Sequence, residues 1–512
     1  MGRIRPHRHR LGTSSPLRTV RSAASPVSVR RVRPTGTASN STRGLSREEP
    51  RPSVRLVTAL LAGKAAAVTS RLLGRGGGTS LPGVVARRVD PGILGRLVAA
   101  CDVPVIVITG SNGKTTTARL TAALLRGEGQ PVVHNAAGSN LVQGLTSLVV
   151  NAADLRGRLP QGLLLVEVDE GTLPRVVSDL DPRVLVVTGI FRDQLDRFGE
   201  LYAVADAIES AAREMGPDAA LVVNGDDALV ADLASDWRGR RVAFGLELDS
   251  STDEVTRAAD SIRCPRCRAA LCYTHVYLSH LGEYRCPSCG FARPSLDVVV
   301  TALEVRGLTE TAMTMRTPSG VAELTVPQAG VHIAYDTAGA LAACVALGLE
   351  CPSAADSLAR IGPAFGRLEQ IQAEGRRVVL AFAKNPTSFN TTLQTLVGGG
   401  EPRHLLVAVS NTPVDGEDFG WLWDVEFERI ADPVERVTVS GLRADELANR
   451  LKHAGIALDR IHLEVDRPTA LEHALAAVPS GGTLVVLGGY TPTLEFRDAM
   501  RRRGWTNRFW QA

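Results

Sequence analysis

Residues 103–116 read VPVIVITGSNGKTT, and this stretch decides the fold that we expect. The first six residues are an unbroken apolar run, which is typical of a strand buried in a parallel sheet. The glycines that follow would let backbone N–H groups approach a phosphate, and the next helix would add its N-terminal dipole. The stretch therefore predicts a nucleotide phosphate loop between a strand and a helix.

Individual residues of the loop suit this chemistry. Lys114 would contact the β- and γ-phosphates of a nucleotide, and the Thr115 hydroxyl would hold Mg²⁺. The residues expected to bind the nucleotide are Gly110, Asn112, Gly113, Lys114, Thr115 and Thr116. Ile108 occupies the first glycine position of a full Walker motif, so the loop is a variant. An ordinary glycine-rich turn is the alternative, but strand, loop, Lys-Thr pair and helix agree with one another.

Similar apolar runs recur along the chain, with helix-compatible sequence between them. They lie at Leu163–Val166, Val184–Val187 and Leu221–Val223 in the first part, and at Val378–Phe382, Leu405–Val409, Val437–Val439, Ile461–Val465 and Leu484–Leu487 in the second. Such alternation predicts doubly wound α/β sheets. A chain of 512 residues is too long for a single core. We expect one α/β domain over 54–372 and a smaller one over 373–512.

The chain starts with a strongly basic segment. Residues 1–52 contain twelve arginines, and their acids are Glu48 and Glu49. The segment has no apolar periodicity, so it predicts disorder over residues 1–53. A transit peptide, a solvated tail and a misplaced start codon are the alternatives. Elsewhere the composition is that of a soluble globular protein, and no apolar run is long enough to span a membrane.

Four of the eight cysteines form two C-x-x-C pairs within residues 262–293. They are Cys264, Cys267, Cys286 and Cys289. Paired C-x-x-C turns about twenty residues apart are typical of a tetrahedral zinc site with four thiolates. Disulfides are the alternative, but no secretory signal indicates an oxidising compartment. We expect a structural zinc ribbon inserted into the first domain.

The phosphate loop, G-x-N-G-K-T-T, resembles that of the Mur ligase superfamily, ATP-dependent enzymes that join amines to carboxylates through an acyl phosphate. The resemblance implies that Glu167, at the end of a buried strand, binds Mg²⁺. Residues 193–198, DQLDRF, resemble the family's D-H-x-D-R segment with Gln194 in place of histidine. Residues 366–369, GRLE, resemble its interdomain link, in which Arg367 would reach the γ-phosphate. The adenine-side motif H-N-x-x-N departs from the family and reads HIAYD at 332–336.

The zinc-ribbon insertion narrows the resemblance from the superfamily to the MurT family. The resemblance to that family covers most of residues 54–512. Residues 383–390, AKNPTSFN, resemble that family's A-K-N-P-x-G-x-N, and 415–424, DGEDFGWLWD, resemble its D-G-x-D-x-S-W-I-W-D. The resemblance implies that Lys384 reaches the phosphates when the second domain closes. It also implies that an aspartate of 415–424 orients a histidine of a partner subunit. We rank Asp424 first and Asp418 second.

The resemblance implies an activity and a partner. ATP would phosphorylate the α-carboxylate of D-glutamate in the stem peptide of lipid II, and ammonia would convert the acyl phosphate to D-isoglutamine. A glutaminase of the GatD type would supply the ammonia as the second subunit of a heterodimer. The reaction belongs to peptidoglycan synthesis and would take place in the cytoplasm, at the inner face of the plasma membrane.

Three other functions are compatible with parts of the sequence. The first is another Mur-type amide ligase, either amino-acid-adding or folylpolyglutamate-like. Several such enzymes use a carbamylated lysine, but no lysine lies between Lys114 and Lys384. The second is nucleic-acid binding through the Arg-rich segment and the zinc ribbon. The ribbon has few basic and aromatic residues, so we expect no nucleic-acid partner. The third is a scaffold that binds ATP without catalysis.

Overall fold

The computed structural model describes residues 53–72, 80–101, 103–135, 138–193, 201–249, 260–362, 366–400, 403–412 and 415–506. The Arg-rich segment that the sequence predicts to be disordered lies outside the described residues, apart from Ser53. So do residues 194–198 of the DQLDRF motif. None of the described helices is both long and apolar enough to cross a membrane.

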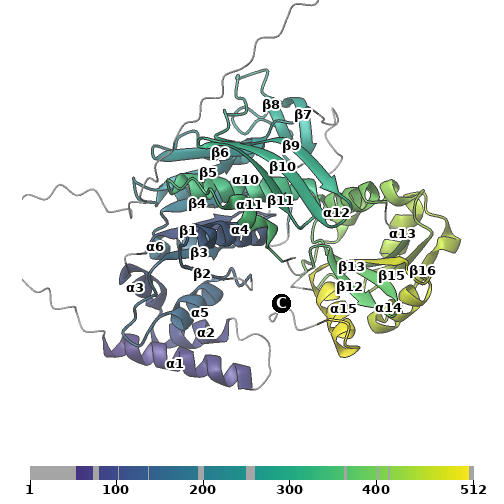
Figure 1. Ribbon diagram of the computed structural model, residues 1–512, viewed down its shortest axis with the longest axis horizontal. Coiled ribbons are helices and arrows are strands. Elements are labelled where there is room, and N and C mark those ends of the chain that lie inside the picture. Colours follow the sequence, from purple (N-terminus) through teal and green to yellow (C-terminus); the bar gives the residue numbers. More distant parts are fainter. Residues whose placement is uncertain are drawn as a thin grey trace, which may run out of the picture. The chain divides into compact units, whose positions relative to one another are not determined.

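The first domain is built on a nine-stranded sheet with the spatial order β11-β10-β9-β6-β5-β4-β1-β3-β2 (Figure 1). Its strands are β1 (Val105–Thr109), β2 (Val132–His134), β3 (Leu163–Glu167), β4 (Val184–Val187), β5 (Ala220–Asn224), β6 (Arg240–Leu246), β9 (Val298–Arg306), β10 (Glu310–Thr317) and β11 (Gly320–Val326). Neighbours from β2 to β9 are parallel, and β9, β10 and β11 pair antiparallel. The strand order changes direction beside β1, and the carboxyl ends of strands at such a point form a ligand crevice.

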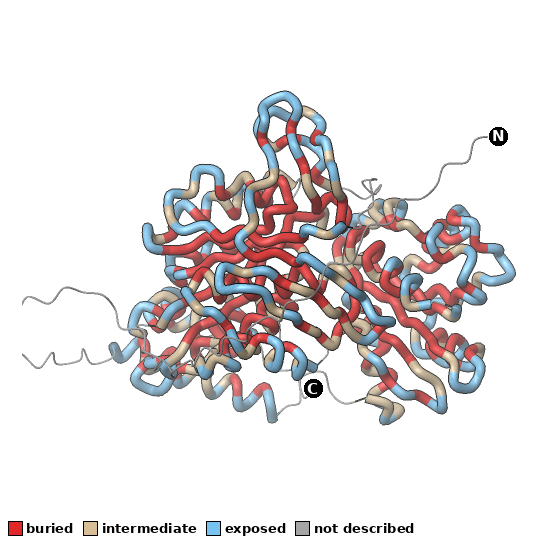
Figure 2. Tube along the Cα trace, turned by 45° about the horizontal axis from the view of Figure 1, so that its top comes forward, coloured by how far each residue is buried: buried red, intermediate tan, exposed pale blue. Residues whose placement is uncertain are grey.

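Helices cover both faces of this sheet because its strands are apolar on both sides. Ile106 and Ile108 of β1 pack in the same cluster as α4 (Lys114–Gly127) and α10 (Val331–Ala346). Val105 and Val107 pack on the opposite face. The helices of that face include α1 (Val54–Leu72), α2 (Leu81–Val89), α3 (Ile93–Ala99), α5 (Val142–Ala152), α6 (Val177–Leu180) and α8 (Leu201–Arg213). Figure 2 shows the strands as buried segments between helices whose outer sides are exposed.

The cysteine-rich insertion forms an antiparallel hairpin of β7 (Cys272–Leu278) and β8 (Leu281–Arg285), between β6 and β9 in the chain. Its base has a small core of its own that includes Tyr284 and Phe291. This core also contains Ala228 and Ala231 of α9 (Ala228–Leu233), so the insertion packs against the first domain.

The second domain has a six-stranded sheet with the order β12-β13-β17-β14-β15-β16. Its strands are β12 (Glu369–Ala373), β13 (Arg376–Phe382), β14 (His404–Ala408), β15 (Arg436–Ser440), β16 (Ile461–Leu463) and β17 (Thr483–Gly488). All are parallel except β12, which pairs antiparallel with β13. The helices around the sheet are α12 (Pro386–Gly398), α13 (Ala444–His453), α14 (Arg467–Ala476) and α15 (Tyr490–Arg502). The predicted α/β architecture is confirmed, and the second sheet begins at Glu369, before position 373.

Candidate functional site

The phosphate loop lies between β1 and α4, at the carboxyl edge of the first sheet. Gly110 and Gly113 have φ angles of +124° and +85°, in a region that residues with a Cβ rarely adopt. A Cβ at Gly110 would collide with Thr188 Oγ1, and one at Gly113 would collide with Asp336 Oδ1. Both positions therefore require glycine for backbone conformation and for space.

Lys114 is buried at the first position of α4 and points back into the loop. Its ammonium donates to the carbonyl oxygen of Gly110 and, at 3.1 Å, to Glu170 Oε1. Burial lowers the pKa of Lys114, but the carboxylates of Glu170, Glu167 and Asp193 outweigh it, so the net pKa is raised. The site therefore holds a permanent cation where the sequence predicts phosphate contacts.

Thr115 and Glu167 lie together beside this cation. The Thr115 hydroxyl donates to Glu167 Oε2 at 2.8 Å, and Asn140 Nδ2 donates to the other carboxylate oxygen at 3.2 Å. Asn135 fixes the end of β3 through paired bonds of 2.9 Å with the backbone N–H and C=O of Glu167. A hydroxyl and a carboxylate at this spacing are the hard oxygen donors that Mg²⁺ prefers.

The second domain contributes the loop between β13 and α12. Asn385 caps α12, with Pro386 at its first turn, and forms a capping box with Ser388. The Ser388 hydroxyl also accepts from the backbone N–H of Lys384 at 2.9 Å. The serine that replaces the glycine of A-K-N-P-x-G-x-N therefore fixes the backbone that presents Lys384.

This loop contacts the first domain through Lys384 and Asn385. Lys384 Nζ forms an ion pair with Asp193 Oδ2. Asn385 Nδ2 donates to Asn112 Oδ1 at 3.1 Å. Lys384 is thus held next to the phosphate loop, whereas the pairing of Asn112 with Asn385 has no signal in the sequence.

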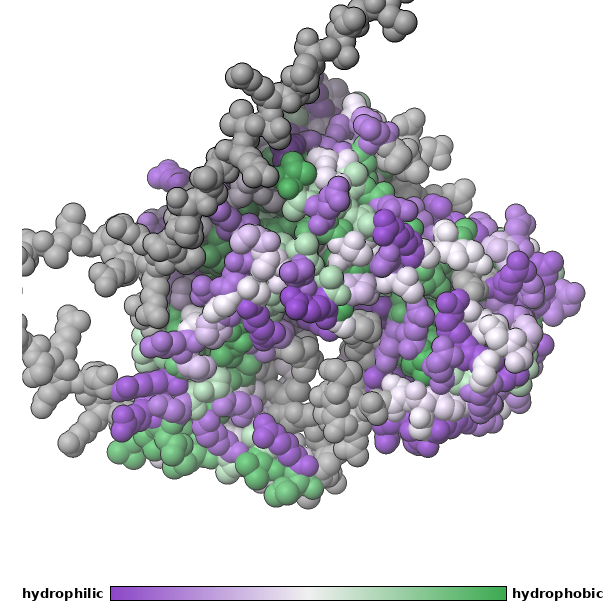
Figure 3. All heavy atoms as spheres, viewed as in Figure 1, coloured by the Kyte–Doolittle hydropathy of each residue, from purple (hydrophilic) through white to green (hydrophobic). Residues whose placement is uncertain are grey.

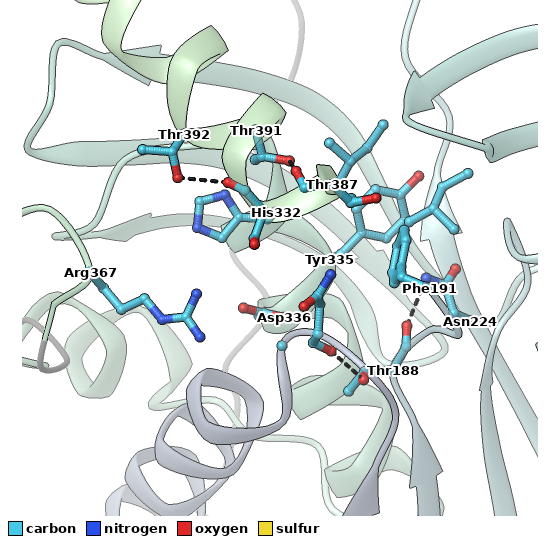
Figure 4. Close-up of a pocket in the computed structure, with 15 residues that line it drawn as sticks. Thr188, Phe191, Asn224, His332, Tyr335, Asp336, Arg367, Thr387, Thr391 and Thr392 are labelled. Atoms are coloured by element: carbon cyan, nitrogen blue, oxygen red, sulfur yellow. Dashed lines mark hydrogen bonds between the residues drawn. The ribbon is translucent and has the colours of Figure 1, made fainter. Parts of the chain in front are cut away.

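A pocket opens beside the loop, at the carboxyl ends of β1, β4 and β5 (Figure 4). Its polar wall contains His332, Asp336 and Arg367, and its apolar wall contains Phe191 and Tyr335. Asn224 Nδ2 donates to the carbonyl oxygen of Thr188 at 3.0 Å, which fixes two strand ends in the wall. Further lining residues come from α12 of the second domain: Thr387, Ser388, Thr391 and Thr392.

The polar wall has unusual electrostatics, because its charged groups are buried. Burial raises the pKa of Asp336 to about 7, against the opposing effect of Arg367. Burial lowers the pKa of Arg367 and, with the nearby Arg367 charge, lowers that of His332 to about 3. Asp336 Oδ2 and His332 Nδ1 are buried without a hydrogen-bond partner among the described residues. Figure 4 shows Arg367 extending toward Asp336 across this space.

The cysteine-rich insertion also reaches this pocket. Leu278 and Leu281, at the tip of the β7–β8 hairpin, line it. Between them, His280 is fully buried, with its ring centroid 4.9 Å from that of Phe191. Sequence reasoning missed these residues, because nothing local indicates where a hairpin tip will pack.

The four cysteines come together at the other end of the hairpin. The sulfurs of Cys264, Cys267, Cys286 and Cys289 all lie within 4.8 Å of one another. In each C-x-x-C turn a later backbone N–H donates to the first cysteine's carbonyl, Arg268 to Cys264 at 2.9 Å and Gly290 to Cys286 at 3.1 Å. Four convergent sulfurs match the donor set of a closed zinc site.

The two candidate partner-facing aspartates have different surroundings. Asp424 Oδ2 lies 3.0 Å from Arg192 Nη1, so this carboxylate forms an ion pair with the first domain. Asp418 is exposed and accepts from the backbone N–H of Gly420 at 2.9 Å. Both line a cavity of about 190 Å³ that also contains Lys384 and Asp193. The roles of these residues stay predictions.

The chain is similar in sequence to known proteins. Residues 108–266 match the model of the Mur ligase middle domain, and residues 382–492 match that of the MurT ligase C-terminal domain. The chain is 30% identical over 448 residues to the lipid II isoglutaminyl synthase (glutamine-hydrolyzing) subunit MurT of Streptococcus pneumoniae, covering 87% of this chain and 96% of that protein. The same subunit of Staphylococcus aureus is 30% identical over 402 residues, covering 78% and 88%.

The fold is also found among solved structures. A pseudomurein peptide ligase type C from Methanothermus fervidus superimposes with a TM-score of 0.62 at 21% sequence identity, covering 78% of this chain and 79% of that one.

Proposed function

The chain belongs to the MurT family of Mur-type ligases, and on that premise we propose that it is the synthetase subunit of a lipid II isoglutaminyl synthase. In this reaction a carboxylate oxygen of D-glutamate in the lipid II stem peptide attacks the γ-phosphorus of ATP. ADP leaves and an acyl phosphate forms. Ammonia then attacks the acyl carbon to form a tetrahedral intermediate. The nitrogen loses a proton, the bond from carbon to the phosphate oxygen breaks, and inorganic phosphate and the amide are released.

The observation that carries this proposal is the grouping of Lys114, Thr115 and Glu167 at one loop, with Lys384 delivered from the second domain. Phosphoryl transfer needs little covalent help from the protein, and its rate depends on positioning and on cations near the transferred oxygens. Lys114 and Lys384 supply two such cations. Arg367, buried in the pocket wall, supplies a third on the side of Asp336.

Thr115 and Glu167 would hold Mg²⁺, which when bound neutralises charge on the phosphate oxygens. Asn140 and Asn135 orient Glu167. Leu278, Leu281, Phe191 and Tyr335 would pack against the base of the nucleotide. This apolar contact compensates for the departure of residues 332–336 from the family's adenine motif.

The ammonia would come from a glutaminase subunit of the GatD type. Glutamine hydrolysis needs a thiolate beside a histidine. Four cysteines belong to the cluster of sulfurs, and Cys344 and Cys351 are buried in the core. Cys101 Sγ accepts from the backbone N–H of Leu159, and Cys272 is exposed at the start of β7, with Arg285 as its ladder partner. These environments do not suit a glutaminase nucleophile. The lipid-linked substrate implies that the complex acts at the inner face of the plasma membrane.

The proposed function is tested by incubating the purified chain with lipid II, ATP, Mg²⁺ and an ammonium salt, and identifying the product by mass spectrometry. Conversion of the stem-peptide glutamate to isoglutamine, with one ADP formed per amide, is the expected result. Incorporation of an amino acid instead of ammonia would indicate another Mur-type ligase. ATP binding without turnover would indicate a scaffold.

We expect the four cysteines to bind one zinc ion per chain. Thiolate zinc contributes roughly 10–16 kcal/mol to the folding of small modules. The double variant Cys286→Ser/Cys289→Ser should lose the metal, and its ATP affinity should fall several-fold because the hairpin tip lines the pocket. Metal analysis and calorimetric ATP titration measure the two effects. Cys272→Ser, exposed and outside the cluster, is the control. Freshly purified protein without zinc would contradict the expectation.

Nucleotide affinity should depend on pH through Asp336. Its pKa of about 7 means that the carboxyl is neutral below pH 7 and ionised above it. Ionised Asp336 would hold Arg367 and repel phosphate, so ATP affinity should fall several-fold between pH 6 and pH 8.5. Asp336→Asn, which places the family's asparagine here, should remove this dependence in a calorimetric titration.

The same substitution has a stability signature. A carboxyl whose pKa is raised on folding binds its proton more tightly in the folded state than in the unfolded state. The protein therefore loses stability as the pH rises from about 4 to 7 and this carboxyl ionises. Asp336→Asn should therefore melt higher than the unsubstituted protein at pH 8 and show little gain at pH 4. Equal shifts at both pH values would refute the assignment.

A further inference from the structure

Helix α1 exposes apolar side chains on the side that faces away from the sheet. Val54, Leu61, Val68 and Leu72 are 84%, 51%, 55% and 82% exposed. Their spacing of seven, seven and four residues places them on one face of the helix. Hydrophobic residues gather at the lower edge of the molecule in Figure 3, where Figure 1 places α1. We call these four residues the α1 outer face.

The inner side of the same helix packs against the rest of the first domain. Leu56, Ala59 and Leu60 are buried in the cluster that covers the sheet, and Lys64 Nζ donates to the carbonyl oxygen of Asn151 in α5 at 3.3 Å. A helix that is apolar on both sides is normally covered on both sides. The α1 outer face is therefore a surface that lacks a cover among the described residues.

The charges carried by helices α1 and α2 themselves have one sign, although Asp90 and Asp154 lie near Arg55 and Lys64. Residues 53–89, which include α1 and α2, contain no aspartate or glutamate. Arg55, Arg71 and Arg88 are exposed on these two helices. The preceding residues 1–52 add twelve arginines against two glutamates, in a chain whose total net charge is only +4. Helices α1 and α2 thus combine exposed apolar side chains with an excess of basic residues, and the sequence that precedes them is basic as well.

We propose that the α1 outer face docks the protein on an anionic lipid bilayer; this inference rests on the proposed function, whose substrate is lipid-linked. Apolar side chains that enter the headgroup region, flanked by arginines, are the signature of an interfacial helix. A nucleic acid would bind the arginines but leave the four apolar side chains exposed. A second copy of this chain would bring two positive surfaces together.

Helix α5 connects α1 to the candidate metal site of the first domain. Helix α5, against which α1 and α2 pack, begins next to Leu141, another exposed apolar residue. Its neighbour Asn140 donates to Glu167 in the candidate metal site. Docking through α1 would therefore fix the orientation of α5, and with it that of the metal site, relative to the bilayer that carries the substrate.

The test measures binding of the full chain to vesicles without lipid II, by co-sedimentation. The vesicles contain either phosphatidylcholine alone or phosphatidylcholine with phosphatidylglycerol. The chain should bind the anionic vesicles, and Leu61→Gln/Val68→Gln should weaken this binding at least about tenfold, because two apolar side chains no longer enter the interface. The control Val321→Gln/Leu442→Gln alters two comparably exposed residues elsewhere and should bind as the unsubstituted chain does.

Other results would overturn the docking proposal. Equal vesicle binding by Leu61→Gln/Val68→Gln and the control would assign the binding to the arginines alone. Dissociation of a dimer by the same substitutions, seen by analytical ultracentrifugation, would assign the face to a second copy. ATP affinity is measured in parallel and should be unchanged, which shows that the variant is folded. Amidation of a stem peptide without lipid reports on the proposed function separately and should proceed at the unsubstituted rate.

Discussion

Replacing Lys114 by alanine is expected to lower ATP-dependent amidation at least about a hundredfold, because loss of a preorganised charge at the reacting group has effects of this size. Lys114 is buried, and its ammonium donates a hydrogen bond to the carbonyl oxygen of Gly110. Lys114→Arg should fail as well, since a planar guanidinium does not fit the space of a compact ammonium. Steady-state ADP release and amide formation give the two rates, and Lys452→Ala, exposed on α13, is the control.

The single substitution also leaves Glu170 buried without its cation. Removing one partner of a buried pair costs about 3–5 kcal/mol of stability, so lost activity alone would be ambiguous. Lys114→Met/Glu170→Gln removes both charges and should restore the melting temperature without restoring amidation. If amidation returns with stability, Lys114 acts through folding, and the phosphate role assigned to it is wrong.

The fold was accessible from the sequence because its signals are local. An apolar run such as Val184–Val187 is buried whatever lies beside it, and each predicted run coincides with a strand. The phosphate loop could be predicted equally well, because Gly110 and Gly113 are needed for positive φ angles within the loop itself. Strand ends such as Glu167 follow from the rule that ligands bind at the carboxyl edge of a parallel sheet.

The contacts between distant segments were not accessible in this way. Asn112 and Asn385 are 273 positions apart, and an asparagine carries no signal for the partner that it will meet. The A-K-N-P stretch identified Lys384 as a candidate site residue. The ion pair of Lys384 with Asp193 could not be predicted, because it depends on how the two domains meet. Leu278 and Leu281 lie in an insertion whose cysteines indicate metal binding, so their packing into the pocket had no motif to indicate it.

The structure shows what two departures from the family pattern do, Ser388 in place of glycine and Asp336 in place of asparagine. Ser388 in place of glycine completes a capping box, so it strengthens the start of α12. Asp336 in place of asparagine puts a titrating carboxyl with a pKa of about 7 beside Arg367. The first departure is thus structural, whereas the second predicts a property of this chain that an asparagine would not give.

Asparagine at position 424 is expected to separate the two halves of the proposed reaction. In the complex with its glutaminase, Asp424→Asn should lose at least about a hundredfold of glutamine-dependent amidation, because a histidine that lacks its orienting carboxylate is a poor base. Amidation driven by free ammonium should continue, since Lys114, Thr115 and Glu167 are untouched. Both rates are measured on the same preparation, with Asp432→Asn, exposed in the same domain, as the control.

The geometry gives this experiment a sharp alternative. Asp424 Oδ2 lies 3.0 Å from Arg192 Nη1, and Arg192 also forms an ion pair with Asp260. Asp424 lines a cavity that Lys384 lines as well. If ammonium-driven amidation falls as far as the glutamine-driven rate, Asp424 serves the synthetase site through Arg192. Asp418→Asn then becomes decisive, because Asp418 is exposed and has no ion pair with the described part of the first domain. Loss of the glutamine-driven rate in that variant alone would move the partner-facing role to Asp418, whereas full activity would exclude it. In the expected case Trp423, 54% exposed next to Asp424, marks where the glutaminase binds.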